Sequence, residues 1–279
     1  MNRLILIALL LGICLTGVAV AQGPLLIAAG PSAANAPSFF LPVNTDNNIE
    51  ADRVALSAPA TLPRMAPELA LQAYQRRWES QSAELVSYSA NTLIRAELPE
   101  TQQRGELQLQ RHYAAPRTLE FKTVHYTGDG FVKNNVITRL LQSEVDHVQK
   151  DDASLTALTP ANYKFSFKGT NQMGGRLVHD YQVKPRKKRA GLFKGHVYLD
   201  AYTGSLVRVE GTVVKSPSFF IKKIEFVQDY ADIGVFTLPT HMHSEAVARI
   251  IGRAVVDIYQ DEYQPSTNTV QASQQIPSM

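Results

Sequence analysis

The chain has 279 residues, with 28 Lys and Arg against 25 Asp and Glu, a formal net charge of +3 and a single cysteine. A charge balance this close argues against a nucleic-acid binder, because such proteins carry a strong and clustered basic excess. One cysteine excludes a disulfide within the chain, so a stable domain must depend on its apolar core.

The first residues have the layout of a secretory signal peptide. Arg3 precedes an apolar run from Leu4 to Val20, and Ala19-Val20-Ala21 presents small residues where a signal peptidase reads them. We therefore expect a cleaved signal peptide at 1–21 and a periplasmic protein, secreted across the inner membrane. The alternative is an uncleaved anchor, since the run approaches the length of a bilayer span. Lipid attachment at Cys14 is less favoured, because Ile13 stands where a small residue is needed.

Composition divides the rest of the chain into three parts. Residues 22–64 are rich in Ala, Pro, Asn and Ser without sustained periodicity, which predicts a disordered linker. Residues 265–279 are rich in Ser, Thr, Asn and Gln, and we expect a disordered tail. The folded domain is expected at 65–264.

The domain is expected to open with a helix. Pro67 suits a first helical turn, where its missing N–H costs nothing. Apolar residues then recur on one side at helical spacing: Ala70, Leu71, Tyr74 and Trp78.

After this helix the pattern changes to alternation of apolar and polar residues, which is typical of antiparallel strands with one dry face. Turn signals such as Gly174-Gly175 and Asp232-Ile233-Gly234 separate the segments. About ten strands are expected, near 84–97, 105–113, 117–126, 162–170, 176–184, 193–200, 205–214, 219–230, 235–248 and 254–263.

One helical pattern interrupts the strands at 131–150. Its apolar side contains Val136 or Ile137, then Leu140, Leu141, Val145 and Val148. The predicted fold class is therefore α+β, mainly antiparallel β: a strongly curved, unclosed β-barrel (half-barrel) with helices covering the concave face.

Catalytic signatures are missing from the sequence. It contains no Gly-x-Ser-x-Gly, no phosphate loop, no Gly-x-Gly-x-x-Gly and no His-Glu-x-x-His. His241 and His243 share a strand face and, with His179 or His196, raise the possibility of a metal site. No acidic or sulfur ligand stands at a matching spacing, so solvent-facing strand histidines are the preferred interpretation. We expect no enzyme, no cofactor, no metal and no catalytic residue.

The strongest local charge feature is the basic run Lys184, Arg186, Lys187, Lys188 and Arg189 at a predicted hairpin tip. It suits docking to an anionic membrane or an acidic partner. The plainer interpretation is a solvated turn that discourages aggregation at a sheet edge. Ser216 to Phe220 forms a second predicted turn, with two aromatic residues.

The apolar sheet positions are the candidate binding site. If the helices only half fill the concavity, the remainder is a cleft for acyl chains; otherwise these residues form an ordinary packed core. The candidate lipid-binding residues are Leu93, Leu107, Leu109, Leu119, Phe121, Phe165, Phe167, Leu177, Tyr181, Leu199, Ile224, Phe226 and Leu238, and the candidate lid-helix residues are Ile137, Leu140, Leu141 and Val145.

The order of elements resembles the LolA/LolB-like periplasmic lipoprotein carriers, the outer-membrane lipoprotein-sorting family. The resemblance spans about Met65 to Tyr263 and is most specific in the segments 195–200, 204–210, 216–219, 236–239, 252–254 and 261–263. It implies an unclosed barrel with a helical lid over a lipid-holding cavity. It also implies a basic residue on an early strand that holds the lid shut, for which Arg95 and Arg111 are candidates by position.

Three functions follow as hypotheses. The first is a periplasmic carrier of lipids or acylated lipoproteins for lipoprotein sorting or envelope lipid transport, acting with an envelope or outer-membrane partner protein. The second is a non-enzymatic sensor or scaffold of the same fold, similar to regulators of anti-sigma factors. The third is a metallohydrolase that uses the paired histidines. None involves nucleic acid.

Overall fold

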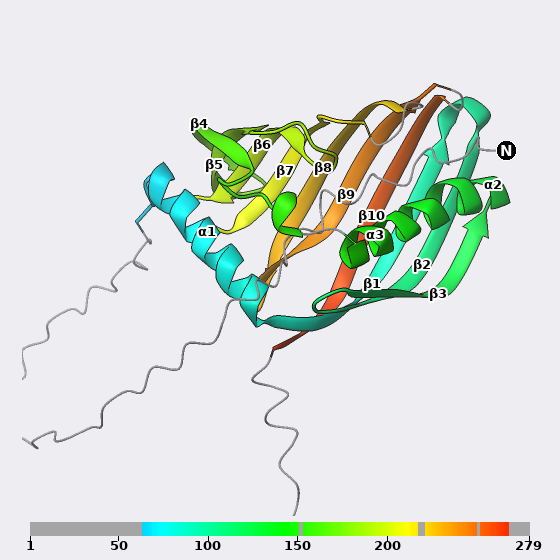
Figure 1. Cartoon of the computed structure of the whole chain (residues 1–279), viewed down its shortest axis with the longest axis horizontal. Coiled ribbons are helices and arrows are strands. Elements are labelled where there is room, and N and C mark those ends of the chain that lie inside the picture. The colour runs from blue at the N-terminus through cyan, green and yellow to red at the C-terminus, as the bar shows by residue number, and fades with distance from the viewer. Residues whose placement is uncertain (1–62, 151–152, 217–220, 250–251, 268–279) are drawn as a thin grey trace, which may run out of the picture. The chain divides into compact units, whose positions relative to one another are not determined.

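The computed structural model describes residues 63–150, 153–216, 221–249 and 252–267. In these residues one ten-stranded antiparallel sheet curves around two helices that lie on its concave side (Figure 1). The half-barrel predicted from the sequence is therefore confirmed. The expected signal peptide, most of the linker and Phe219-Phe220 lie outside the described residues.

The elements follow the alternation in the sequence closely. The helical elements are α1 (Pro67–Glu84), η1 (Pro99–Thr101), α2 (Gly130–Val132), η2 (Lys133–Ile137), α3 (Thr138–Lys150) and η3 (Ala153–Leu155). The strands are β1 (Leu85–Leu98), β2 (Gln103–Ala114), β3 (Thr118–Gly128), β4 (Tyr163–Met173), β5 (Arg176–Pro185), β6 (Phe193–Asp200), β7 (Leu206–Val213), β8 (Ile221–Ile233), β9 (Phe236–Ala248) and β10 (Gly252–Thr267). The last strand extends past the boundary expected at 264.

The strand order explains why the sheet stays open. It is β3-β2-β1-β10-β9-β8-β7-β6-β5-β4, so strands that follow each other in sequence pair except β3 and β4, and β10 also pairs with β1. The segment from α2 to η3 connects β3 to β4, and these two strands form the opposite edges of the sheet. A helical crossover thus takes the place of the tenth pairing, which would have closed the barrel.

The concave face of the sheet forms the core. Alternate residues of the central strands point to it, among them Ile94, Phe226, Met242 and Ile258, and all four are buried. A second, smaller apolar cluster lies at the end of the sheet where β1, β3 and β9 begin, and it includes Tyr88, Tyr113, Leu119, Phe236 and Leu238.

The helix expected at 131–150 is present but is not a continuous α-helix. The five residues of η2 form a π-helical turn between α2 and α3. The sequence pattern left Val136 and Ile137 as alternatives for one apolar position, but both are buried. The wider turn allows this, because it rotates neighbouring side chains relative to a regular α-helix.

Among the described residues, no helix combines the length and apolar character needed to span a bilayer.

Candidate ligand-binding face under the helix 130–150

Most of the predicted site residues do lie on the concave side. Six belong to the main buried cluster: Leu107, Leu109, Tyr181, Leu199, Ile224 and Phe226. Phe121 and Phe165 pack against it and are partly buried, and Leu119 and Leu238 belong to the second cluster. The structure thus brings together residues from strands far apart in the sequence.

The predicted place of Leu93 on the concave face is wrong, because this residue lies on the convex face. It alternates with the buried Ile94 and pairs across the strands with Gln108 and with Tyr259, which is 39% exposed. The period of two places neighbouring residues on opposite faces. The apolar character of Leu93 alone therefore misassigned its side.

Phe167 and Leu177 lie at the margin of the face. Phe167 is 44% exposed because it belongs to the edge strand β4, and its ring lies 5.8 Å from that of Tyr181. Leu177 is partly buried, and its carbonyl accepts a hydrogen bond from the Ala201 N–H.

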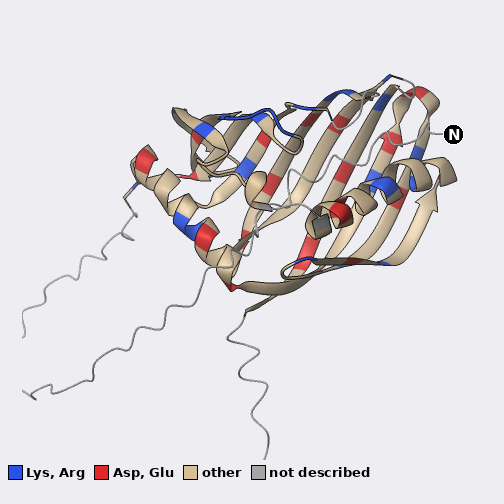
Figure 2. Ribbon diagram, viewed as in Figure 1, with Lys and Arg blue, Asp and Glu red and all other residues tan. Residues whose placement is uncertain are grey.

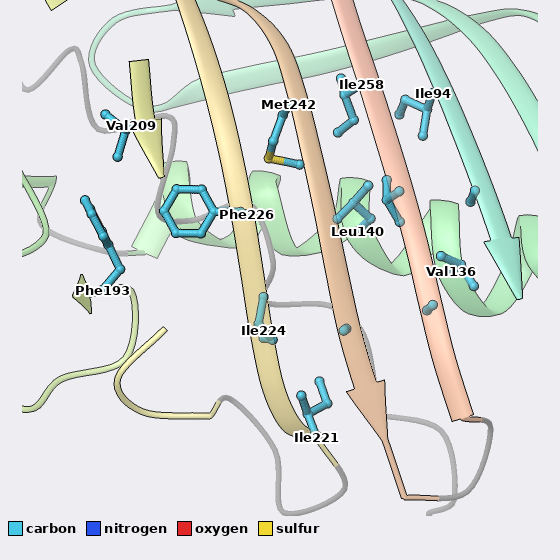
Figure 3. Packing of buried hydrophobic residues seen from close by; sticks show 14 of the residues in the cluster. Ile94, Val136, Leu140, Phe193, Val209, Ile221, Ile224, Phe226, Met242 and Ile258 are labelled. Atoms are coloured by element: carbon cyan, nitrogen blue, oxygen red, sulfur yellow. The ribbon is translucent and has the colours of Figure 1, made fainter. Parts of the chain in front are cut away.

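The covering helices lie at separate places on this face. α1 packs against β6, whereas α2, η2 and α3 pack against β1, β2 and β3. The strands β8, β9 and β10 add apolar side chains to the same cluster, including Phe226, Met242 and Ile258 (Figure 3). These central side chains are buried, so the structure shows the face in a covered state.

The helix 130–150 packs on both apolar clusters. Val136, Ile137 and Leu140 are buried in the main cluster, and Leu141 packs against it. Val145 and Val148 pack against the second cluster. The predicted lid-helix residues therefore all face the sheet.

A buried ion pair separates these two apolar contacts. The Arg111 guanidinium of β2 donates through Nη2 to Oε2 of Glu144 on α3 at 2.5 Å, and both side chains are 0% exposed. Nε and Nη1 of Arg111 and Oε1 of Glu144 have no hydrogen-bond partner among the described residues. The Phe121 ring lies 5.1 Å from the guanidinium carbon.

Burial governs the titration of the groups around this pair. It raises the pKa of Glu144, although the Arg111 charge acts in the opposite direction. Burial lowers the pKa of Arg111, but Glu144 and then Tyr88 outweigh it, so that this pKa is raised. Burial also raises the pKa of Tyr88, and it raises the pKa of Tyr113 to about 12. Arg111 is therefore a permanent cation held away from water.

The contacts of Arg111, which pairs with Glu144 beneath α3, distinguish it from Arg95. Arg95 lies on the convex face, where it pairs with Glu106 at 2.8 Å. The sequence offered both as candidates by position. The missed residue was Glu144, which follows Leu140 by four residues in α3 and therefore lies on the same side of the helix, facing the sheet.

α1 is attached to the sheet by contacts of a different kind. At its start, Tyr181 Oη donates to the Pro67 carbonyl at 2.5 Å, and the His179 ring lies 3.0 Å from the Met65 carbonyl. At its end, Gln81 donates to the Val235 carbonyl and accepts from the Thr237 N–H. Hydrogen bonds therefore hold both ends of α1, and Arg77 of α1 also pairs with Asp232 of β8 at 3.5 Å.

The histidines do not gather at one place. His241 and His243 lie on the convex face, where each contacts Asp257 at about 3 Å. His196 pairs with Asp180 on the same face, whereas His179 lies on the concave side near α1. In the described ranges no three His, Cys, Asp or Glu side chains form a group able to hold one metal ion.

The fold therefore defines the protein as an unclosed antiparallel half-barrel with a covered apolar face. Neither a protein-family model nor a curated protein sequence matches the chain.

Several solved structures are similar in form. One is a domain named as an outer membrane lipoprotein-sorting protein from Vibrio parahaemolyticus, with 11% identity, 72% of this chain and 94% of that chain covered, and a TM-score of 0.38. A LolA superfamily protein from Nitrosomonas europaea has 8% identity and a TM-score of 0.36. The match covers 72% of this chain and 93% of that chain. The MucA/MucB complex of Pseudomonas aeruginosa has 10% identity, covers 74% and 96%, and scores 0.21. The family that the sequence resembles is thus found among these solved structures. Similarity this low assigns no function.

Proposed function

We propose that this protein is a non-enzymatic periplasmic carrier that holds the acyl chains of a lipid or lipoprotein against its concave face. The helix 130–150 acts as the lid. The observation that carries the proposal is the buried pair Arg111–Glu144 beneath that helix.

The pair makes the closed lid less stable than an apolar contact would be. Removing two ionic groups from water costs several kcal/mol each, and their attraction offsets this only when the remaining donors and acceptors are satisfied. Here three polar atoms of the pair lack protein partners. The lid is therefore apolar at both ends of its contact and strained in the middle, which favours opening without loss of the sheet.

An acyl chain supplies the free energy that opening requires. Each buried methylene contributes about 0.8 kcal/mol, so a chain of about ten methylenes contributes roughly 8 kcal/mol. Exposing a fully buried Val, Leu or Ile costs about 1.5–3 kcal/mol, so such a chain offsets the exposure of roughly three to five lid side chains. The central strip of β8, β9 and β10 then becomes the surface on which the chain lies.

The test is lipid binding by the intact protein. Protein purified from its native host is analysed by lipid mass spectrometry, and uptake of a fluorescent fatty acid is measured in solution. Ala246→Phe places a large ring on the buried concave side of β9, whereas Val247→Phe places the same ring on the exposed convex side of that strand. We expect the first variant to weaken uptake and the second to leave it unchanged.

Circular dichroism establishes that both variants are folded. An empty wild-type protein that also refuses the fatty acid would rule the carrier function out.

A further inference from the structure

Basic side chains collect at one end of the sheet. Because the strands are antiparallel, the end of β5, the start of β6, the end of β7 and the start of β8 meet there. We call this surface the basic rim; it consists of Lys184, Arg186, Lys187, Lys188, Arg189, Lys194, Lys215, Lys222 and Lys223. Figure 2 shows Lys and Arg following this upper edge.

The turn after β5 is held in place by its own arginines. Arg186 Nε donates to the Pro160 carbonyl at 2.7 Å, and Arg189 Nη1 donates to the Leu155 carbonyl at 3.4 Å. Lys187 and Lys188 between them are exposed. The arginines therefore order the turn, and the lysines face solvent.

The two ends of these strands differ in charge. At the rim, Glu225 pairs with Lys223 at 2.7 Å. At the other end, β6 finishes at Asp200 and β8 carries Asp229 and Asp232. Asp229 and Asp232 are paired with Arg208 and Arg77, so the charges at that end are balanced, whereas cations are in excess at the rim.

Apolar side chains are exposed at the same end of the sheet as the cations. Leu155, whose carbonyl binds Arg189, is 43% exposed. Phe131 is 39% exposed in α2, which begins beside the start of β2 at this end of the sheet, four strands from β8. Exposed apolar residues next to Lys and Arg are the pattern of an interfacial membrane anchor, whereas an acidic protein segment needs only the charges.

We propose that the basic rim docks the half-barrel on an anionic phospholipid membrane, with Leu155 and Phe131 at the lipid interface. The proposal rests on the carrier function above, because a carrier must reach a bilayer to load or release its lipid. The present proposal adds to the carrier function by naming the surface of the protein that approaches the bilayer.

The test is flotation of the full protein with vesicles of pure phosphatidylcholine and with vesicles of phosphatidylcholine and phosphatidylglycerol in equal parts. We expect binding to the anionic vesicles only. This binding should be lost at high salt, because the screening length of electrostatic interactions becomes shorter. Lys187→Gln/Lys188→Gln is expected to weaken this binding by roughly 25-fold, at about fivefold for each cation removed.

The control removes the same charge from the adjoining hairpin of β4 and β5, away from the rim. Lys168→Gln/Arg176→Gln alters two exposed residues of β4 and β5, with Arg176 at the far end of β5, and should bind like the wild type. No binding to anionic vesicles, or equal binding by both double variants, would overturn the proposal. Capture of poly-glutamate in place of vesicles would also overturn it, in favour of an acidic protein partner.

Fatty-acid uptake in solution separates this proposal from the carrier function. A protein that takes up fatty acid but ignores anionic vesicles refutes only the basic rim. A protein that docks on vesicles but takes up no fatty acid refutes only the carrier.

Discussion

Glu144→Ala isolates the cost of the buried ion pair. The substitution removes the acceptor of Arg111 Nη2 and leaves the guanidinium, which is 0% exposed, without a counter-charge. Breaking a buried pair in this way costs about 3–5 kcal/mol. The matched control is Glu79→Ala on the exposed face of α1, which should change the free energy of unfolding by less than about 0.5 kcal/mol.

The double variant Arg111→Met/Glu144→Leu should behave differently from either single change. Its apolar side chains would join the two clusters that the pair now separates. Replacing a buried pair by packed apolar residues is neutral or stabilises by about 1–4 kcal/mol. The double variant should therefore be at least as stable as the wild type. If the lid must open for loading, it should also take up fatty acid more slowly.

Urea unfolding measures these differences, with Trp78 as the single tryptophan reporter. Hydrogen exchange of the α3 amides shows whether the lid alone loosens in Glu144→Ala. A cost below about 1 kcal/mol for Glu144→Ala would refute the reasoning. A double variant as unstable as the sum of the single changes would refute it equally.

Three further changes test the packing around the face. The pKa of Tyr113 is raised from 10.0 to about 12 by burial. This phenol therefore stabilises the fold fully below pH 10, and that stability is lost as pH rises through 12. When unfolding is followed from about pH 9 to 13, the pH dependence of stability in the wild type and in Tyr113→Phe should differ only above about 10. Gly204 has a φ of 72°, and a Cβ there would lie 2.7 Å from that of Ala73 on α1, so Gly204→Ala should cost about 1–3 kcal/mol in thermal unfolding, and no change would contradict the contact. Gln81→Ala removes both hydrogen bonds at the end of α1 and should cost about 1–3 kcal/mol, with faster hydrogen exchange in α1; unaltered exchange would speak against this anchor.

The strands and helices were predictable because the buried side of each element requires apolar residues at a regular spacing in the sequence. Alternation such as that of Leu107 and Leu109 with Glu106 and Gln108 marks a sheet with one dry face, and all ten expected strands are present. The helical spacing at 131–150 likewise predicted an element with one apolar side. Most of the candidate residues for this reason lie on the concave side, except for Leu93.

Pairings across long stretches of sequence were not predictable. Arg111 lies between Leu109 and Tyr113, so the alternation of β2 places it on the concave side, beneath α3, but does not identify its partner. Glu144 was its partner, 33 residues away in the chain. No local pattern reports such a distance.

The sequence by itself determined the class of the domain, since the spacing of apolar residues is a local property that records which side of each element avoids water. It also determined the basic turn at 184–189. Only the tertiary structure decided which strands form the two open edges, that an ion pair lies under the lid, and that Lys194, Lys215 and Lys222 join that turn in one rim. Strand order and side-chain partners depend on contacts between distant segments, and those contacts form only when the chain folds.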